Sequence, residues 1–129
     1  MTGGIEAETI HLGAYNCTDV DITGNIRTSV PMEYHGEIVA VYAQITAAPA
    51  GSGGSVLLNV ELDGTNLTGG VVTIATGDAM GDNKAGTAVT ASTAVFHRGT
   101  LLDVEAASPT TFTGGSFDLY ARVIRKPGA

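Results

Sequence analysis

Residues 36–62 read GEIVAVYAQITAAPAGSGGSVLLNVEL and decide the fold of this chain. In residues 38–45, apolar side chains occupy both faces of an extended chain. One face carries Val39, Val41, Ala43 and Ile45, and the other carries Ile38, Ala40, Tyr42 and Gln44. A strand with two apolar faces is expected in the middle of a sandwich or at a contact between subunits. Residues 56–63 alternate apolar and polar side chains, which predicts a strand with one solvated face, and the Pro- and Gly-rich residues 48–54 predict the loop between the two strands.

Short alternating segments follow one another along the rest of the chain, separated by turns that contain Gly or Pro. The pattern predicts a hairpin over residues 20–30 and a type I′ turn at Asp63-Gly64. Further strands are expected at residues 65–67, 71–75, 87–97, 101–106 and 117–123. No segment has the periodicity of an amphipathic helix of about ten residues or more. We therefore predict an all-β fold, an antiparallel β-sandwich of about eight strands in a jelly-roll arrangement.

The length and composition are those of one folded domain. A chain of 129 residues with 43% hydrophobic and 15% charged residues has enough apolar surface for a single core. We assign residues 16–129 to one β-sandwich domain. Residues 1–15 alternate more weakly and are expected to form either the first strand or an N-terminal arm that reaches onto a neighbouring molecule.

The charge of the chain restricts its partners. A formal net charge of −7 opposes binding to nucleic acid and to anionic lipid. No apolar run approaches the roughly 20 residues of a membrane helix, and the start of the sequence lacks the features of a signal peptide. We therefore expect a protein that is made in the cytoplasm and binds neither nucleic acid nor membranes.

Catalytic and metal-binding patterns are missing from the sequence. The single cysteine, Cys17, is followed by Asp19 and Asp21, which would raise its pKa and make it unreactive. Three histidines, His11, His35 and His97, are not spaced as metal ligands on one strand, and we expect them to be scattered. We predict a protein that is not an enzyme and that uses no metal or cofactor.

The acidic and aromatic residues also show no pattern typical of a catalytic or binding site. The acidic residues of the loop 76–86 depart from the order of a calcium-binding loop. The acids Asp103, Glu105 and Asp118 could approach one another as a glycosidase pair, but on alternating strands they are expected to face water. Four Tyr and three Phe are scattered along a chain without Trp, which argues against the aromatic platforms of a sugar site.

The order of segments from residue 36 to the end resembles the small β-sandwich domains of tailed-bacteriophage virion proteins, especially head decoration proteins and head fibres. The matching segments are GEIVAVYAQITAAPAGSGGSVLLNVELDGTNL, VFHRGTLLDVEAAS and GGSFDLYARVIRKPG. In such domains, a strand leads through an Ala-Pro-Ala-Gly type of loop to a strand that ends in Asp-Gly or Asn-Gly. This chain has Gly99-Thr100 where such domains often have Gly-Asp.

The resemblance implies a capsid decoration, or cement, protein: a homotrimer on the outside of the phage head that ties neighbouring major capsid proteins together. We expect the two-faced strand to contribute to the trimer contact, the N-terminal residues to add a strand to a capsid sheet, and the basic C-terminal residues either to be solvated or to dock on an acidic partner. The candidate partner-contact residues are Ile5, Ile10, His11, Ile38, Tyr42, Arg122, Arg125 and Lys126.

Two alternatives remain open. One is a receptor- or glycan-binding module of a phage fibre, in which exposed loops such as residues 76–86 make the recognition. The other is an enzyme whose catalytic residues form no local motif. Glycan binding in the absence of capsids would favour the first of these over a decoration protein.

Overall fold

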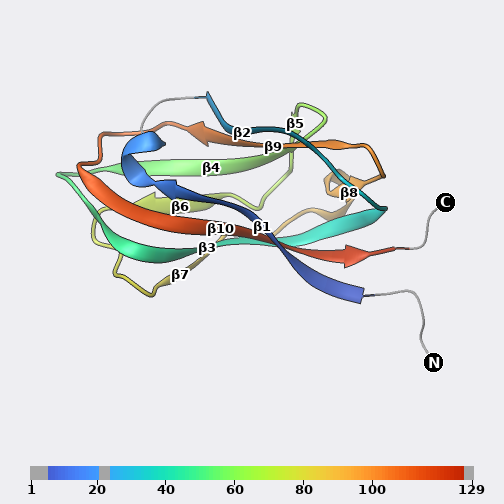
Figure 1. Cartoon of the computed structure of the whole chain (residues 1–129), viewed down its shortest axis with the longest axis horizontal. Helices are drawn as coiled ribbons and strands as arrows, with labels where there is room; N and C mark the ends of the chain where they lie inside the picture. The colour runs from blue at the N-terminus through green and yellow to red at the C-terminus, as the bar shows by residue number, and fades with distance from the viewer. Residues whose placement is uncertain (1–5, 21–23, 127–129) are drawn as a thin grey trace.

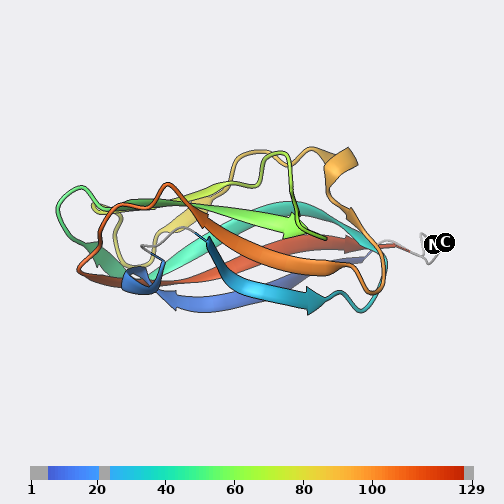
Figure 2. The ribbon, with the colours of Figure 1, turned by 90° about the horizontal axis from the view of Figure 1, so that it is seen from above.

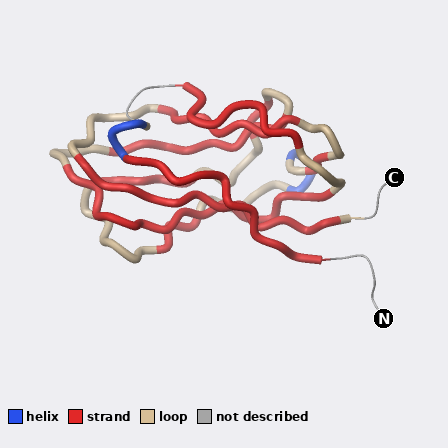
Figure 3. Tube along the Cα trace, viewed as in Figure 1, coloured by secondary structure: helices blue, strands red, loops and turns tan. Residues whose placement is uncertain are grey.

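The computed structural model describes residues 6–20 and 24–126, which form two antiparallel β-sheets packed face to face (Figures 1 and 2). The strands are β1 (Glu6–Asn16), β2 (Gly24–Pro31), β3 (Gly36–Ala50), β4 (Ser55–Leu62), β5 (Thr65–Asn66), β6 (Val72–Ala75), β7 (Asn83–Ala85), β8 (Val95–Phe96), β9 (Leu101–Ala107) and β10 (Gly114–Arg125). Two short 3-10 helices are η1 (Cys17–Asp19) and η2 (Ala91–Thr93). Strands make up most of the described chain (Figure 3).

The first strands of the chain pair with the last ones, β1 with β10 and β2 with β9. Sheet A has the order β1-β10-β3-β7, with β8 also paired to β3, and sheet B has the order β2-β9-β4-β5, with β6 also paired to β4. This nested pairing of early with late strands is that of a jelly roll. The predicted all-β sandwich is therefore confirmed. Within the described residues, no helix is long and apolar enough to cross a membrane.

The two strands predicted from residues 36–62 are present as β3 and β4, but they belong to different sheets. β3 contains a β-bulge, because Arg122 pairs with Ala40 and Val123 pairs with Ile38, which leaves Val39 as an extra residue. One extra residue reverses the alternation of side chains along a strand. The side chain of Ile38 therefore points into the core and is 0% exposed. The expectation that it lies on the face of Tyr42, available to a partner, is wrong.

The core fills the space between the two sheets with small and medium-sized apolar side chains. β10 contributes Phe117, Leu119, Ala121 and Val123, and β9 contributes Leu102, Val104 and Ala106, as their alternation predicts. Asp103 on β9 departs from the prediction, because its side chain is only 9% exposed and does not face open water.

Residues 87–97 do not form the predicted strand. The segment contains only η2 and the two-residue β8, and its backbone instead bonds to the loop before β6, with the Thr87 N–H donating to the carbonyl of Val71. Its Ala, Ser and Thr side chains bury little apolar surface, so alternation alone does not hold the segment in a sheet.

The two predicted turns had different outcomes. Asp63 and Gly64 both have positive φ, 51° and 81°, as a type I′ turn requires, and β5 follows directly. Of the hairpin expected over residues 20–30, the second strand is present within β2, which pairs with β9 in sheet B. The turn predicted within it falls partly on residues 21–23, which lie outside the described residues.

Residues 6–16 form the first strand rather than an arm detached from the domain. β1 pairs with β10 along its whole length, from Glu6 opposite Arg125 to Asn16 opposite Ser116. β1 lies at the edge of sheet A and β2 at the edge of sheet B, and Figure 2 shows the two strands along the same side of the sandwich.

Candidate interaction surface

Three aromatic rings lie next to one another across the outer face of sheet A. His11 on β1 is directly opposite Tyr120 on β10, and Tyr120 is directly opposite Tyr42 on β3. The ring centroids of His11 and Tyr120 are 5.1 Å apart, and those of Tyr120 and Tyr42 are 5.2 Å apart. Residues paired across antiparallel strands project from the same face of a sheet, so the register alone aligns the three rings. We call these three residues the aromatic row.

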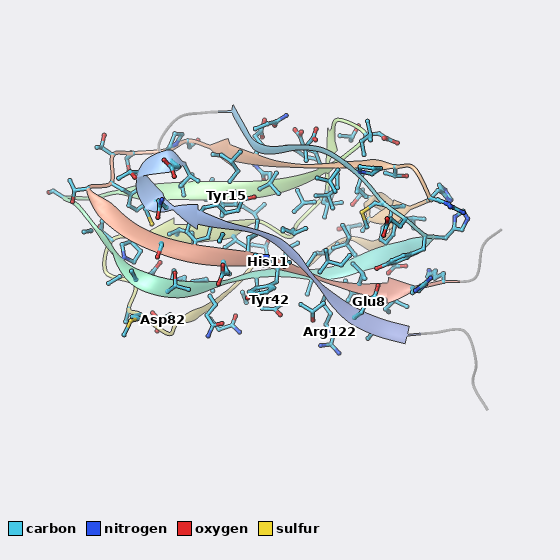
Figure 4. All side chains as sticks on the ribbon, viewed as in Figure 1. Glu8, His11, Tyr15, Tyr42, Asp82 and Arg122 are labelled. Carbon is cyan, nitrogen blue, oxygen red and sulfur yellow. The ribbon has the colours of Figure 1, made fainter. Side chains whose placement is uncertain are left out.

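Polar groups surround the aromatic row. The imidazole Nε2 of His11 lies 3.2 Å from the carboxylate Oδ1 of Asp118, which is two residues from Tyr120 on β10 and therefore on the same face. In the other direction on β10, Arg122 is exposed. His11, Tyr42 and Arg122 are labelled in Figure 4, and the strand register places all three on the outer face of sheet A. The face therefore offers flat rings between a carboxylate and a guanidinium group.

The two tyrosines are half-buried, and beyond Tyr42 the strand β7 presents only the small side chain of Ala85. Tyrosine gives a large contact area at a low cost in conformational entropy and carries a polar hydroxyl, which is why it is common in protein interfaces and sugar sites. The aromatic row is therefore suited to binding a surface or a ligand.

The predicted contact residues are thus only partly brought together. His11, Tyr42 and Arg122 lie on this outer face, whereas Ile38 is buried in the core. Ile5 lies outside the described residues. The structure adds Tyr120 and Asp118, which the sequence places on an outer face but not beside His11 or Tyr42. The expectation that the tyrosines are scattered is therefore wrong for Tyr42 and Tyr120.

Arg125 and Lys126 lie at the far end of sheet A and make contacts within the chain. The guanidinium carbon of Arg125 is 4.4 Å from the ring centre of Tyr34, and the Lys126 ammonium is 2.9 Å from the Glu37 carboxylate. The Tyr34 hydroxyl in turn donates to Glu8. Burial, followed by this bond to the carboxylate, raises the pKa of Tyr34 to about 12. The two basic side chains therefore help to fix this end of the fold.

Ile10 faces the interior and borders a hollow. It is half-buried against the core and lines a cavity of about 390 Å³ on the open side of the sandwich. The other lining residues come from β2 and the turn that follows it: Val30, Pro31, Met32, Glu33 and Tyr34.

The thiol of Cys17 is not available as a nucleophile. Its side chain is 0% exposed, and burial, with a smaller effect of Asp78, raises its pKa to about 11. Asp78, and not the predicted Asp19, is thus the acidic residue that contributes to the raised pKa, and Asp21 lies outside the described residues.

The three acidic residues weighed as a glycosidase pair do not come together. Asp103 and Glu105 lie on sheet B, and Asp118 lies on the outer face of sheet A, on the other side of the core. Asp103 is instead directly opposite Glu61. Burial, followed by the charges of Glu105 and Asp103, raises the pKa of Glu61. Burial and the two neighbouring carboxylates thus oppose ionisation of Glu61.

The loop after β6 is held by its own acidic side chains. The Asp78 carboxylate accepts from the Lys84 ammonium at 2.8 Å, and the Asp82 carboxylate accepts from the backbone N–H of Ala79 at 2.8 Å. Among residues 6–20 and 24–126, no group of three or more His, Cys, Asp or Glu side chains is arranged to hold a metal ion.

The comparisons with known proteins do not add a relative. No protein-family model, no curated protein and no solved structure matches this chain.

Proposed function

We propose that the protein is a capsid decoration protein, which binds the outside of an assembled bacteriophage head through the outer face of sheet A. The observation that carries the docking site is the aromatic row of His11, Tyr120 and Tyr42. The choice of a phage head as partner rests on the resemblance of the segments from residue 36 to the end of the chain to head decoration domains.

Physical considerations favour this face as the docking surface. The centre of a stable interface is rich in Tyr and Arg and poor in Lys and acidic residues. The aromatic row, together with Arg122, has this composition, although the chain as a whole carries a net charge of −7. Truncation of either tyrosine should therefore cost much more affinity than truncation elsewhere on the surface.

The proposed mechanism requires no catalytic step. A protein that binds the assembled shell and not its separated subunits stabilises the shell by its differential affinity. The proposed partners are the major capsid protein and two further copies of this chain. Ile38 is buried and Tyr42 belongs to the surface proposed to dock on the capsid, so neither residue is assigned to the trimer contact.

The test is to mix the purified protein with undecorated capsids and to measure occupancy of the lattice symmetry axes by electron microscopy. We expect Tyr42→Ala and Tyr120→Ala to lower occupancy strongly. Leu57→Ala is the matched control, because Leu57 is 36% exposed and lies on β4 in the opposite sheet. Equal occupancy by all three variants would show that the aromatic row is not the docking site. No binding by the unmodified protein would contradict the capsid as its partner.

The same row favours one second function, a glycan-binding module of a phage fibre. Flat aromatic faces beside a carboxylate and a guanidinium group are the usual elements of a sugar site. For this function, the aromatic row would bind the glycan. The loop 76–86 would not, because the salt bridge between Lys84 and Asp78 holds it in place. Glycan-array binding without capsids, lost in Tyr42→Ala, would favour this function.

A further inference from the structure

Two histidines far apart in the sequence meet at one end of the sandwich. His35 precedes β3 and His97 follows β8, and their imidazole Nδ1 atoms are 3.1 Å apart. The ring centroids are 5.3 Å apart, and the rings meet edge to face at 72°. The expectation of three scattered histidines is therefore wrong for this pair. Neither side chain is fully buried, so solvent reaches the pair.

The pairing of β3 with β8 holds the two histidines opposite each other. Gly36 is directly opposite Phe96 and Glu37 is directly opposite Val95, so His35 and His97 occupy the next position of the same antiparallel register. Side chains at such positions project to the same side. Gly36 is needed for this approach, because a Cβ at this position would lie 2.6 Å from the ring of Phe96.

Backbone bonds fix both histidines from outside the pair. The Lys126 N–H donates to the carbonyl of His35 at 2.9 Å, and the His97 N–H donates to the hydroxyl of Thr100 at 3.0 Å. The two turns are also joined directly, since the Met32 N–H donates to the Thr100 carbonyl at 2.8 Å. The pair therefore lies on two turns that are already held together.

The spacing of the nitrogens suits a metal ion as well as a hydrogen bond. Imidazole nitrogens bind Zn²⁺ at roughly 2.0–2.1 Å, so two of them at a coordination angle of about 90–110° are about 2.9–3.4 Å apart. The observed 3.1 Å between the Nδ1 atoms lies within this range. Without a metal, the same distance fits an N–H···N bond between two neutral rings.

We propose that His35 and His97 chelate a divalent transition-metal ion, such as Zn²⁺, Ni²⁺ or Cu²⁺, through their Nδ1 atoms. Because no third protein ligand is arranged around them in the described part of the chain, water completes the coordination. Imidazole ligands suit these ions, and Cu²⁺ should bind most tightly. The site is independent of the proposed function, since it lies on the turns at the end of the sandwich and not on the aromatic row.

A bound ion would join the two connections that cross between the sheets at this end. The turn containing His35 leads from β2 in sheet B to β3 in sheet A, and the turn containing His97 leads from β8 in sheet A to β9 in sheet B. A ligand that binds only the folded chain raises its stability. The expected effect is a melting temperature that increases with the concentration of the ion.

The test uses the full chain without a histidine tag and titrates it with ZnCl₂, NiCl₂ or CuCl₂. We expect calorimetry to give one ion per chain and thermal unfolding to shift upward. His35→Ala and His97→Ala should each weaken binding by more than about tenfold, because a single ligand loses the advantage of chelation. His11→Ala is the matched control and should bind as the unmodified chain does.

A second variant and a residue-specific measurement distinguish the loss of a metal ligand from the loss of the fold. His35→Gln keeps a polar side chain of similar size, and far-ultraviolet circular dichroism without metal shows whether each variant is folded. In an NMR spectrum, Cu²⁺ should broaden amide signals beside His35 and His97 and leave those beside His11 sharp. Unchanged affinity in the two single variants, broadening centred on His11, or no saturable binding at millimolar ion would each overturn the proposal.

Discussion

Tyr42 and Tyr120 stack on each other across the pair of strands β3 and β10, with their ring planes inclined by only 20°. The contact joins the middle of the chain to its C-terminal strand on the solvent side of sheet A. It therefore adds to stability from outside the core, in addition to its proposed part in binding.

A double-mutant cycle should detect this contact as a coupling energy. Tyr42→Ala and Tyr120→Ala each remove the stacking, so their combined effect on the free energy of unfolding should be less than the sum by about 0.5–1.5 kcal/mol, the usual worth of an aromatic pair. Chemical denaturation of the two single variants and the double variant measures the coupling. Strictly additive effects would mean that the rings do not interact in solution.

Ile38→Ala should be far more destabilising than Val39→Ala. The Ile38 side chain is 0% exposed, and removing such a side chain typically costs about 2–5 kcal/mol, whereas the half-buried Val39 is the extra residue of the bulge. Denaturant midpoints of the two variants measure the difference. The reverse order would mean that β3 has the regular alternation predicted from the sequence.

Most of the fold could be predicted from the alternation of apolar and polar residues, and each prediction that failed did so for a specific physical reason. Alternation in residues 101–106 and 117–123 predicts the inward faces of β9 and β10 correctly, because each regular strand has one buried side. It fails at Ile38, since a bulge depends on the partner strand and leaves no mark in the residue pattern. It fails again at residues 87–97, where most side chains are Ala, Ser or Thr and too small to hold the whole segment in a sheet.

The candidate site was less predictable than the fold. The sequence places His11, Tyr42 and Tyr120 on strands, but only the register of β1, β10 and β3 aligns their rings. The same limit applies to His35 and His97, whose contact depends on the pairing of β3 with β8. Strand alternation identifies a face, whereas a site on a sheet requires the offsets between strands.

Gly69→Ala should destabilise the protein much more than Gly64→Ala. Both glycines have positive φ, 84° and 81°, so a new side chain is strained at either position. At Gly69, however, the added Cβ would also lie 1.8 Å from the carbonyl oxygen of Ala88, whereas at Gly64 it meets no atom within 4 Å. Thermal unfolding of the two variants separates the two effects. Equal destabilisation would show that the Ala88 segment moves aside easily.

The thiol of Cys17 should be protected in the folded protein. With its pKa raised to about 11 from 9.0, its thiolate fraction near neutral pH falls by roughly a hundredfold, and burial blocks the reagent in addition. We expect a disulfide reagent to label the native chain more than about a hundredfold more slowly than the chain unfolded in denaturant. Labelling at similar rates would mean that the segment around η1 opens readily.

Glu61→Gln should stabilise the protein at neutral pH. Glu61 is directly opposite Asp103, and its pKa is raised above the ordinary 4.5 by burial and by the charges of Glu105 and Asp103. A carboxyl group with a raised pKa is favourable to the fold while protonated, and this contribution is lost as the pH rises through the folded pKa. Relief of a directly opposed pair of like charges should give about 0.2–1 kcal/mol at pH ~7.

The same substitution should have little effect in acid, where Glu61 is protonated in both the folded and the unfolded chain. The difference between Glu61→Gln and the unmodified protein should therefore grow as the pH rises from below 4.5, which urea unfolding across the pH range measures. Glu33→Gln is the control, because Glu33 is exposed and its loss changes the net charge equally. If both variants gained the same stability, the effect would come from net charge and not from the carboxylates that face each other on sheet B.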